Sequence, residues 1–325
     1  MTDTWTWATV TQASPLRIKV DGDTSALNAT TDNLVGSLAV DDRVRVHLHA
    51  DGIIVTGIQG GGNRSNPNLL INGNFQINQR GYVSGSTFGN YQGGEYGFDR
   101  WEATQSGTTL AFTASPQGQL VTLNDGKRQR QLIERENVPA GDYVLSWEGD
   151  VTARVSNVGG SASFASSPVL VTLDGTDDVV VEIGSFGGTY PFGNVKMERG
   201  TVPTPYQPPT YADNLRACMR YYQRFPALED ITRFGLGVAR TSTKSRISVP
   251  MLVPMRDSGV TLTYSADLRV TQTGTAPTIS SLSVNSRGTS IMYLECAHST
   301  MTGGGVPIEL LAGSTGSFIA FDARL

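Results

Sequence analysis

Apolar and polar residues alternate along most of the chain, which is the pattern of strands with one buried face. In the first sixty residues, Leu16, Ile18 and Val20 alternate with basic residues, and residues 44–48 repeat this pattern. Five short segments of this kind in so short a stretch predict a small barrel of OB type. Residues 1–60 are therefore interpreted as an OB-like barrel that serves as a docking module or anchor.

The alternation continues beyond a glycine-rich segment, 61–67, which predicts a flexible linker. Residues 68–208 contain several alternating segments without an intervening helix, a pattern typical of a β-sandwich such as a jelly roll. The prolines between 201 and 209 predict an extended strap that leaves this sandwich. Residues 227–325 predict a further β domain, a C-terminal sandwich module. The predicted fold class is therefore mainly β, with one connecting helix.

That helix is predicted at residues 209–226. Thr210 is a good N-cap, and Asp213 follows it at the spacing of a capping box. The apolar residues then recur at intervals of four and three, as in a heptad seam: Tyr211, Leu215, Cys218, Tyr222 and Phe225. The seam either packs within its own domain or forms a helical bundle on the axis of a homotrimer, and the spacing leaves both arrangements open.

Charge narrows the set of partners. The chain has 325 residues, 25 basic against 29 acidic ones and a net charge of −4, which excludes a generic basic nucleic-acid binder. Residues 1–60 carry four basic and seven acidic side chains, so no nucleic-acid partner is expected for the barrel either. No apolar run is long enough for a membrane span, and the first residues lack the pattern of a signal peptide. We therefore expect a non-exported chain without membrane insertion.

Few residues suggest a metal or cofactor. Cys218 and Cys296 are interpreted as buried free thiols, which fits folding in a reducing cytosol. The turn with Asp174, Asp177 and Asp178 offers oxygen ligands for calcium, although an acidic turn is the simpler interpretation. We expect no cofactor apart from this weak calcium candidate.

Catalytic motifs are also sparse. The sequence lacks a nucleophile elbow, a histidine-rich metal motif and a phosphate-binding loop. Glu134 and Glu136 would share a strand face if residues 130–137 were extended, at a separation suited to glycoside hydrolysis. The basic residues around them favour a solvated strand of mixed charge instead, and the chain is predicted not to be an enzyme.

Aromatic residues in a loop rich in glycine and polar residues are better candidates for ligand contact, because sugars stack on flat rings. The glycan-contact candidates are Tyr82, Tyr91, Tyr96 and Phe98. The alternative is that these rings cover the end of the sandwich core or a subunit contact. Trp101 and Trp147 are predicted to be core residues.

Four blocks of the sequence resemble a sandwich module that is common in bacteriophage tail-fibre and minor tail proteins. They are NLLINGNFQINQRG at 68–81, FDRW at 98–101, VKMERG at 195–200 and CMRYYQRF at 218–225. Residues 1–60 are similar to the OB-like units that open minor tail proteins of phages of actinobacteria. The segments around 249–256 and 321–325 resemble the terminal β module of such fibres.

This resemblance implies a virion structural protein of the distal tail, at its tip, fibre or baseplate. Such proteins assemble as homo-oligomers, often trimers, and bind other tail proteins. Their sandwich resembles carbohydrate-binding modules, which implies host attachment through surface glycans. They are made in the host cytoplasm and released by lysis. The rival interpretations are a tail-associated glycan-degrading enzyme and a host-encoded carbohydrate-binding adhesin.

Overall fold

The protein is mainly β, as its alternating pattern predicts. A computed structural model describes residues 4–13, 16–27, 31–33, 43–49, 52–58, 66–89, 95–257, 259–272, 277–299 and 305–323. The described residues contain one α-helix, α1 (Tyr211–Met219). The chain divides into two compact units, residues 1–67 with 202–207 and residues 68–201 with 208–325.

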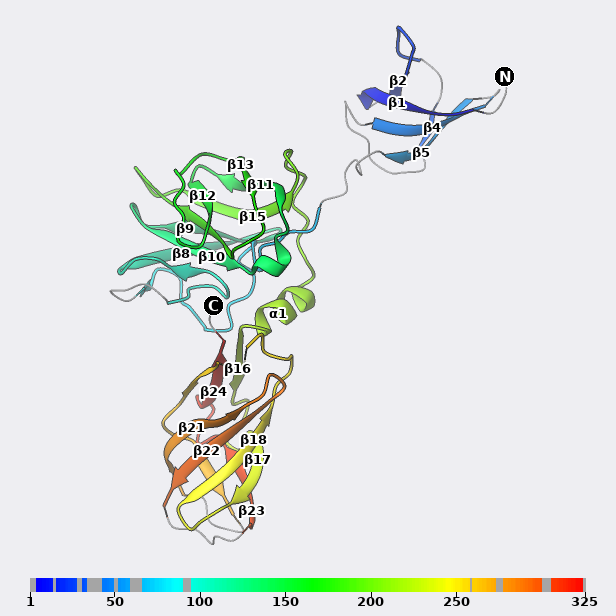
Figure 1. Ribbon diagram of the computed structural model, residues 1–325. Helices are drawn as coiled ribbons and strands as arrows, with labels where there is room; N and C mark the ends of the chain where they lie inside the picture. Colours follow the sequence, from blue (N-terminus) through cyan, green and yellow to red (C-terminus); the bar gives the residue numbers. More distant parts are fainter. Residues whose placement is uncertain are drawn as a thin grey trace. The chain divides into compact units, whose positions relative to one another are not determined.

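The first unit is a small five-stranded sheet (Figure 1). Its order is β2-β1-β4-β5-β3, with β3 parallel to β5 and the other pairs antiparallel, which is the strand order of a partly open OB-type barrel. The alternation places every second side chain, such as Val10, Ile18 and Val46, in one apolar core. The strands are β1 (Thr4–Ala13), β2 (Leu16–Val20), β3 (Thr31–Asn33), β4 (Arg43–His49) and β5 (Gly52–Ile58).

The second unit begins with a β-sandwich of two antiparallel sheets, ordered β12-β14-β10-β7 and β13-β11-β15-β9-β8-β6 (Figure 1). Trp101, Phe75 and Phe192 are fully buried in the core of this sandwich, and Trp147 is also buried there, as predicted for both tryptophans. The strands are β6 (Thr87–Phe88), β7 (Glu102–Ala103), β8 (Thr108–Ser115), β9 (Gly118–Leu123), β10 (Arg128–Ile133), β11 (Gly141–Gly149), β12 (Thr152–Asn157), β13 (Val169–Leu173), β14 (Val179–Gly184) and β15 (Pro191–Arg199).

The helix α1 leads from the sandwich into a C-terminal β domain with its own core. This domain has a three-stranded sheet, β16-β24-β19, and a six-stranded sheet, β20-β23-β17-β18-β22-β21. Cys218 and Cys296 are buried free thiols, as predicted. The strands are β16 (Tyr222–Pro226), β17 (Arg233–Ala239), β18 (Lys244–Pro250), β19 (Thr261–Tyr264), β20 (Arg269–Thr271), β21 (Ile279–Arg287), β22 (Ile291–His298), β23 (Pro307–Leu311) and β24 (Phe318–Asp322).

The predicted helix is correct at its start and wrong at its end. Thr210 caps α1 by accepting a hydrogen bond from the backbone of Asp213, but the helix stops at Met219. Tyr222 and Phe225 lie instead in β16, which pairs with β24 near the C-terminus. Spacings of three and four residues fit a helix locally, but the hydrogen bonds of a strand that arrives about a hundred residues later decide the conformation.

The predicted heptad seam is therefore not continuous. Within α1, Cys218 is buried, Leu215 is half-buried and Tyr211 is 57% exposed. The helix buries Asn214 together with Cys218, four residues apart on one face. The face of α1 that matters for packing inside this chain thus carries a polar side chain that the apolar pattern did not reveal.

One glycine holds a close approach inside the sandwich. A Cβ atom on Gly73 would lie 2.1 Å from the carbonyl oxygen of Val195, whose own amide donates to Gly73. We expect Gly73→Ala to force these backbones apart and to destabilise the sandwich by about 2 kcal/mol or more. Differential scanning calorimetry should show a lower melting temperature.

Gly316→Ala is the matched control, because the nearest atom to a Cβ there is 3.8 Å away. This change should leave the melting temperature nearly unchanged. Equal effects of the two substitutions would contradict the close approach at Gly73.

Candidate functional site

The four sequence blocks at 68–81, 98–101, 195–200 and 218–225 are joined by hydrogen bonds and stacking contacts in the second unit. Residues 68–81 run between β15 and α1. The amide of Leu69 donates to the carbonyl of Met197, and the side chain of Asn72 donates to the carbonyl of Asp99. Residues of the blocks 68–81, 98–101 and 218–225 contact one another, α1 and the C-terminal domain in one region. We call this region the junction.

A buried network of asparagines anchors α1 to the sandwich. The Asn214 side chain accepts a hydrogen bond from the amide of Asn72 at 3.1 Å and donates to Asn74 Oδ1 at 3.1 Å. The carbonyl of Asn72 accepts from Trp101 Nε1 at 2.9 Å. Asn72 has a left-handed backbone (φ 59°), which a non-glycine residue adopts at a cost. The network holds that conformation because each bond in it would be expensive to leave unmade when buried.

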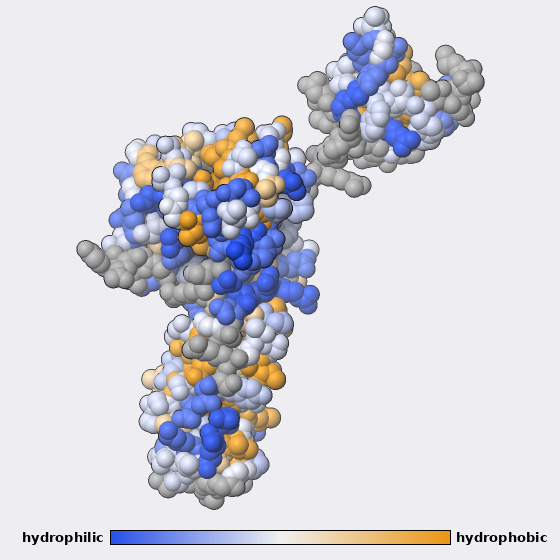
Figure 2. All heavy atoms as spheres, in the orientation of Figure 1, coloured by the Kyte–Doolittle hydropathy of each residue, from blue (hydrophilic) through white to orange (hydrophobic). Residues whose placement is uncertain are grey.

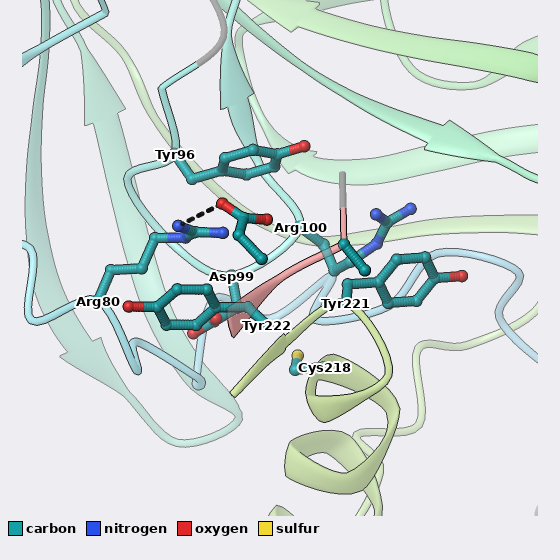
Figure 3. Close-up of a pocket in the computed structure, with 9 residues that line it drawn as sticks. Arg80, Tyr96, Asp99, Arg100, Cys218, Tyr221 and Tyr222 are labelled. Carbon is teal, nitrogen blue, oxygen red and sulfur yellow. Dashed lines mark hydrogen bonds and ion pairs between the residues drawn. The ribbon is translucent and has the colours of Figure 1, made fainter. Parts of the chain in front are cut away.

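Arg80 links the sandwich to the last strand of the chain. Its guanidinium lies 4.6 Å from the ring centre of Tyr96 and 3.8 Å from that of Tyr222, so it is stacked between the two rings (Figure 3). Arg80 Nη1 also pairs with Asp322 Oδ2 at 3.1 Å, the contact drawn as a dashed line in Figure 3. Both side chains of this ion pair are mostly buried, and partial desolvation strengthens such cation–π contacts.

A second arginine makes a parallel contact. The guanidinium of Arg100 lies 3.6 Å from the ring centre of Tyr221 and donates to the carbonyl of Leu132 at 2.6 Å (Figure 3). Arg256 of the C-terminal domain completes the junction by pairing with Glu134 at 2.5 Å. Burial lowers the pKa of Arg100 from its ordinary value, and the neighbouring tyrosines oppose that shift.

Asp99 is the most perturbed acid of the junction. Burial raises its pKa to about 6, although hydrogen bonds from the backbone and side chain of Gln79 oppose the shift. Burial also raises the pKa of the Cys218 thiol, so this cysteine is held in its inert, protonated form. The cavity between these residues encloses about 10 Å³, room for about one water molecule. It is too small for a sugar or a comparable substrate.

The glycan-contact candidates do not form one platform. Phe98 is buried in the sandwich core, where a ligand cannot reach its ring, so its prediction is wrong. Tyr96 stacks on Arg80 in the junction. Tyr82 packs against Phe88, and its hydroxyl bonds to the backbone of Leu110. Tyr91 lies outside the described residues. The described rings thus pack on the sandwich core or in the junction, and glycan contact by Tyr82 and Tyr96 stays a prediction.

The proposed acid pair is not arranged for catalysis. Residues 130–137 are not one strand, because β10 ends at Ile133 and a 3₁₀ turn, η1 (Arg135–Asn137), follows. Glu134 pairs with Arg256 in the junction, whereas Glu136 is exposed and pairs with its neighbour Arg135. The strand assumption was wrong because the chain turns to satisfy its own backbone, with the amide of Asn137 donating to the carbonyl of Glu134.

The carboxylates of the acidic turn at 174–178 accept hydrogen bonds from neighbouring residues. Asp174 Oδ1 accepts hydrogen bonds from the amide and hydroxyl of Thr176, which lower the pKa of Asp174. Asp177 accepts from the same hydroxyl, and Asp178 accepts from the amide of Arg135. Within the described ranges, no group of three or more histidine, cysteine or acidic side chains is placed to hold a metal. Calcium binding there stays a prediction.

Sequence reasoning did not find the residues that carry the junction. Arg80, Arg100 and Asn72 lie inside the blocks that mark the family resemblance, and Asn214 lies on the helix. The available signal was a run of polar residues at short spacing from aromatic ones, but only the fold pairs Arg80 with Tyr222.

Comparison with known proteins adds no assignment: no family model matches the chain, and no curated protein matches it either. The part of the chain that the structure describes contains no helix with the length and apolarity that crossing a membrane requires.

The raised pKa of Asp99 predicts a pH-dependent junction. The folded-state pKa of Asp99 is above the ordinary value of 3.8, so the folded protein holds this proton more tightly than the unfolded chain does. The resulting contribution to the free energy of unfolding is complete below pH 3.8 and is lost as the pH rises through about 6. Asp99→Asn cannot ionise. Its stability relative to the natural chain should therefore increase by roughly 2–3 kcal/mol between pH 4 and pH 7.5. Calorimetric scans at both pH values measure this difference, and parallel pH profiles of the two proteins would refute it.

Proposed function

We propose that this protein is a non-catalytic structural component of a bacteriophage tail tip or fibre, a minor tail protein that assembles as a homo-oligomer and contributes to host attachment. The observation that carries the proposal is that three of the four resemblance-bearing blocks contribute residues to one junction, and the fourth block, 195–200, is hydrogen-bonded to the first through Leu69 and Gly73. Their residues connect the sandwich to α1 and to the last strand, β24, through hydrogen bonds and an ion pair. A joint of this kind, rather than a pocket, is what a connecting element between virion parts requires.

The chemistry of the junction supports a mechanical role. Its cations are neutralised or stacked, its thiol is protonated and its cavity admits about one water molecule. A glycan-degrading enzyme needs two carboxyl groups facing a substrate-sized cleft. Glu134 and Glu136 have separate partners and different exposures, so no observation favours the enzyme alternative.

An apolar surface on the C-terminal domain supports self-assembly. The outer face of the sheet β17–β18–β22 carries exposed apolar side chains, and apolar atoms are visible on this domain in Figure 2. Leu236 is 60% exposed and stands in register with Ser248, which in turn pairs with Tyr293. The exposed apolar residues form two pairs, one on β17 and one on β22, with Ser248 and Arg246 of β18 between them. Apolar residues that share an exposed face mark interaction surfaces more often than isolated ones do. The members are Leu236, Val238, Ile291 and Tyr293.

Light scattering of the purified chain tests the assembly. We expect a mass of about three times the 34.7 kDa of one chain, because a fibre or tip module is built around a symmetry axis. A monomer at micromolar concentration would overturn the homo-oligomer proposal.

Single substitutions locate the interface. Leu236→Asp should dissociate the oligomer, because it places a charge within the apolar face. Leu228→Asp is the matched control, since Leu228 is 83% exposed and lies in the loop before β17 rather than on a strand of the sheet. Leu215→Asp tests the remaining part of the α1 seam, where Leu215 is half-buried and Tyr211 is exposed. Dissociation by Leu215→Asp alone would place the interface on the helix instead of the sheet.

A further inference from the structure

The barrel sorts its basic side chains onto one face of its sheet. The four basic residues of 1–60 are Arg17, Lys19, Arg43 and Arg45, and each alternates with a buried neighbour such as Ile18 or Val44. The strand register places them side by side, because Thr9 on β1 pairs with Lys19 on one side and with Arg43 on the other. The net charge of this segment therefore conceals a basic face.

The same face carries exposed aromatic rings. Trp5 is 50% exposed and Trp7 is 38% exposed, and their side chains are two residues apart on β1, about 6–7 Å along the strand. Trp5 pairs with His47 and stacks flat on its ring, with centres 4.1 Å apart and planes 2° apart. Trp7 pairs with Arg45, whose guanidinium lies 5.0 Å from the Trp5 ring. We call this surface the indole face.

The charge of the indole face is moderate rather than dense. Arg43 is neutralised by a two-pronged ion pair with Asp21, with one contact at 2.6 Å. Arg17, Lys19 and Arg45 form no ion pair with any residue that the structure describes. Three available cations thus border two indole rings, with the hydroxyls of Thr9 and Thr11 on the same face of β1. The Thr9 hydroxyl accepts from Arg43 and can still donate, and the Thr11 hydroxyl donates to the carbonyl of Arg17 and can still accept.

We propose that the indole face binds an anionic polysaccharide, a sugar polymer that carries a carboxylate or phosphate on some of its rings. Indole surfaces stack on sugar rings, threonine hydroxyls bond to sugar hydroxyls, and the separated cations pair with widely spaced anionic groups. This inference names a site and a ligand class for the attachment role proposed above, and it rests on that role.

A polysaccharide fits this face better than a single-stranded nucleic acid does. Nucleic acids present one phosphate per nucleotide and are held in strongly positive grooves. Residues 1–60 have a formal charge of −3, from four basic and seven acidic side chains, and one of the four cations is already paired. A polymer with fewer charges per ring is repelled less by the acidic remainder of the barrel.

Binding of the full-length chain to immobilised polymers tests the proposal. The probes are hyaluronan, which has a carboxylate on every second sugar, uncharged dextran and single-stranded oligothymidylate. We expect binding to hyaluronan at about 50 mM NaCl, clearly weaker binding at about 0.5 M NaCl, and none to dextran. Trp7→Ala should lower the affinity for hyaluronan about tenfold, and Trp7→Phe, which keeps a ring, should lower it much less.

Substitutions of exposed basic residues give a second test of the site and leave the apolar core of the barrel unchanged. The double variant Arg17→Ala with Lys19→Ala should lower the affinity at low salt about tenfold. Arg216→Ala with Arg240→Ala removes the same charge from exposed positions in the second unit and should change nothing. Equal losses from the two pairs would mean unspecific attraction and would overturn the site.

The remaining outcomes are also decisive. Absence of hyaluronan binding at low salt, or tighter binding to oligothymidylate, would overturn the polysaccharide proposal. If the chain is an oligomer by light scattering but does not bind hyaluronan, the proposed site is wrong and the structural role is still supported. A monomer that binds hyaluronan through Trp7 removes the oligomer and keeps the site.

Discussion

The guanidinium of Arg80 is the contact on which the arrangement of the second unit depends. It lies between rings from two parts of the chain, Tyr96 and Tyr222, and pairs with Asp322, a residue 242 positions away. The apolar cores of the sandwich and the C-terminal domain are separate clusters, so hydrophobic burial stabilises each domain by itself. The sandwich and the C-terminal domain are therefore held together by directional polar contacts, which are lost after a small displacement.

A polar joint has physical consequences that an apolar one lacks. Hydrophobic contact is non-directional, so two apolar faces can slide, whereas the Asn72–Asn214 network fixes one register. Its cost is sensitivity, because each buried partner left unpaired carries a desolvation penalty. The buried carboxyl of Asp99 adds a dependence on pH, since burial raises its pKa to about 6. Rigidity in this molecule is therefore linked to proton and hydrogen-bond balance as well as to packing.

Local pattern predicted what local physics decides. Alternation in β2 and β4 follows from one-sided burial and needs no knowledge of the partner strand, and the N-cap at Thr210 forms within one helical turn. The end of α1 could not be predicted, because Tyr222 is drawn into a strand by pairing with Asp322. Phe98 and Glu134 were misjudged for the same reason, since burial and ion pairing depend on distant segments.

In the barrel, the net charge of the sequence is a poorer guide to the surface than the strand register is. A net charge of −3 over residues 1–60 speaks against an anionic ligand only if the charges are mixed over the surface. Strand periodicity gathers the basic ones, because all four fall on the outward parity of β2 and β4, beside Trp5 and Trp7 on β1, and Asp21 neutralises Arg43 among them. What a partner meets is one face and not an average, so the electrostatic question for a β protein has to be asked strand by strand.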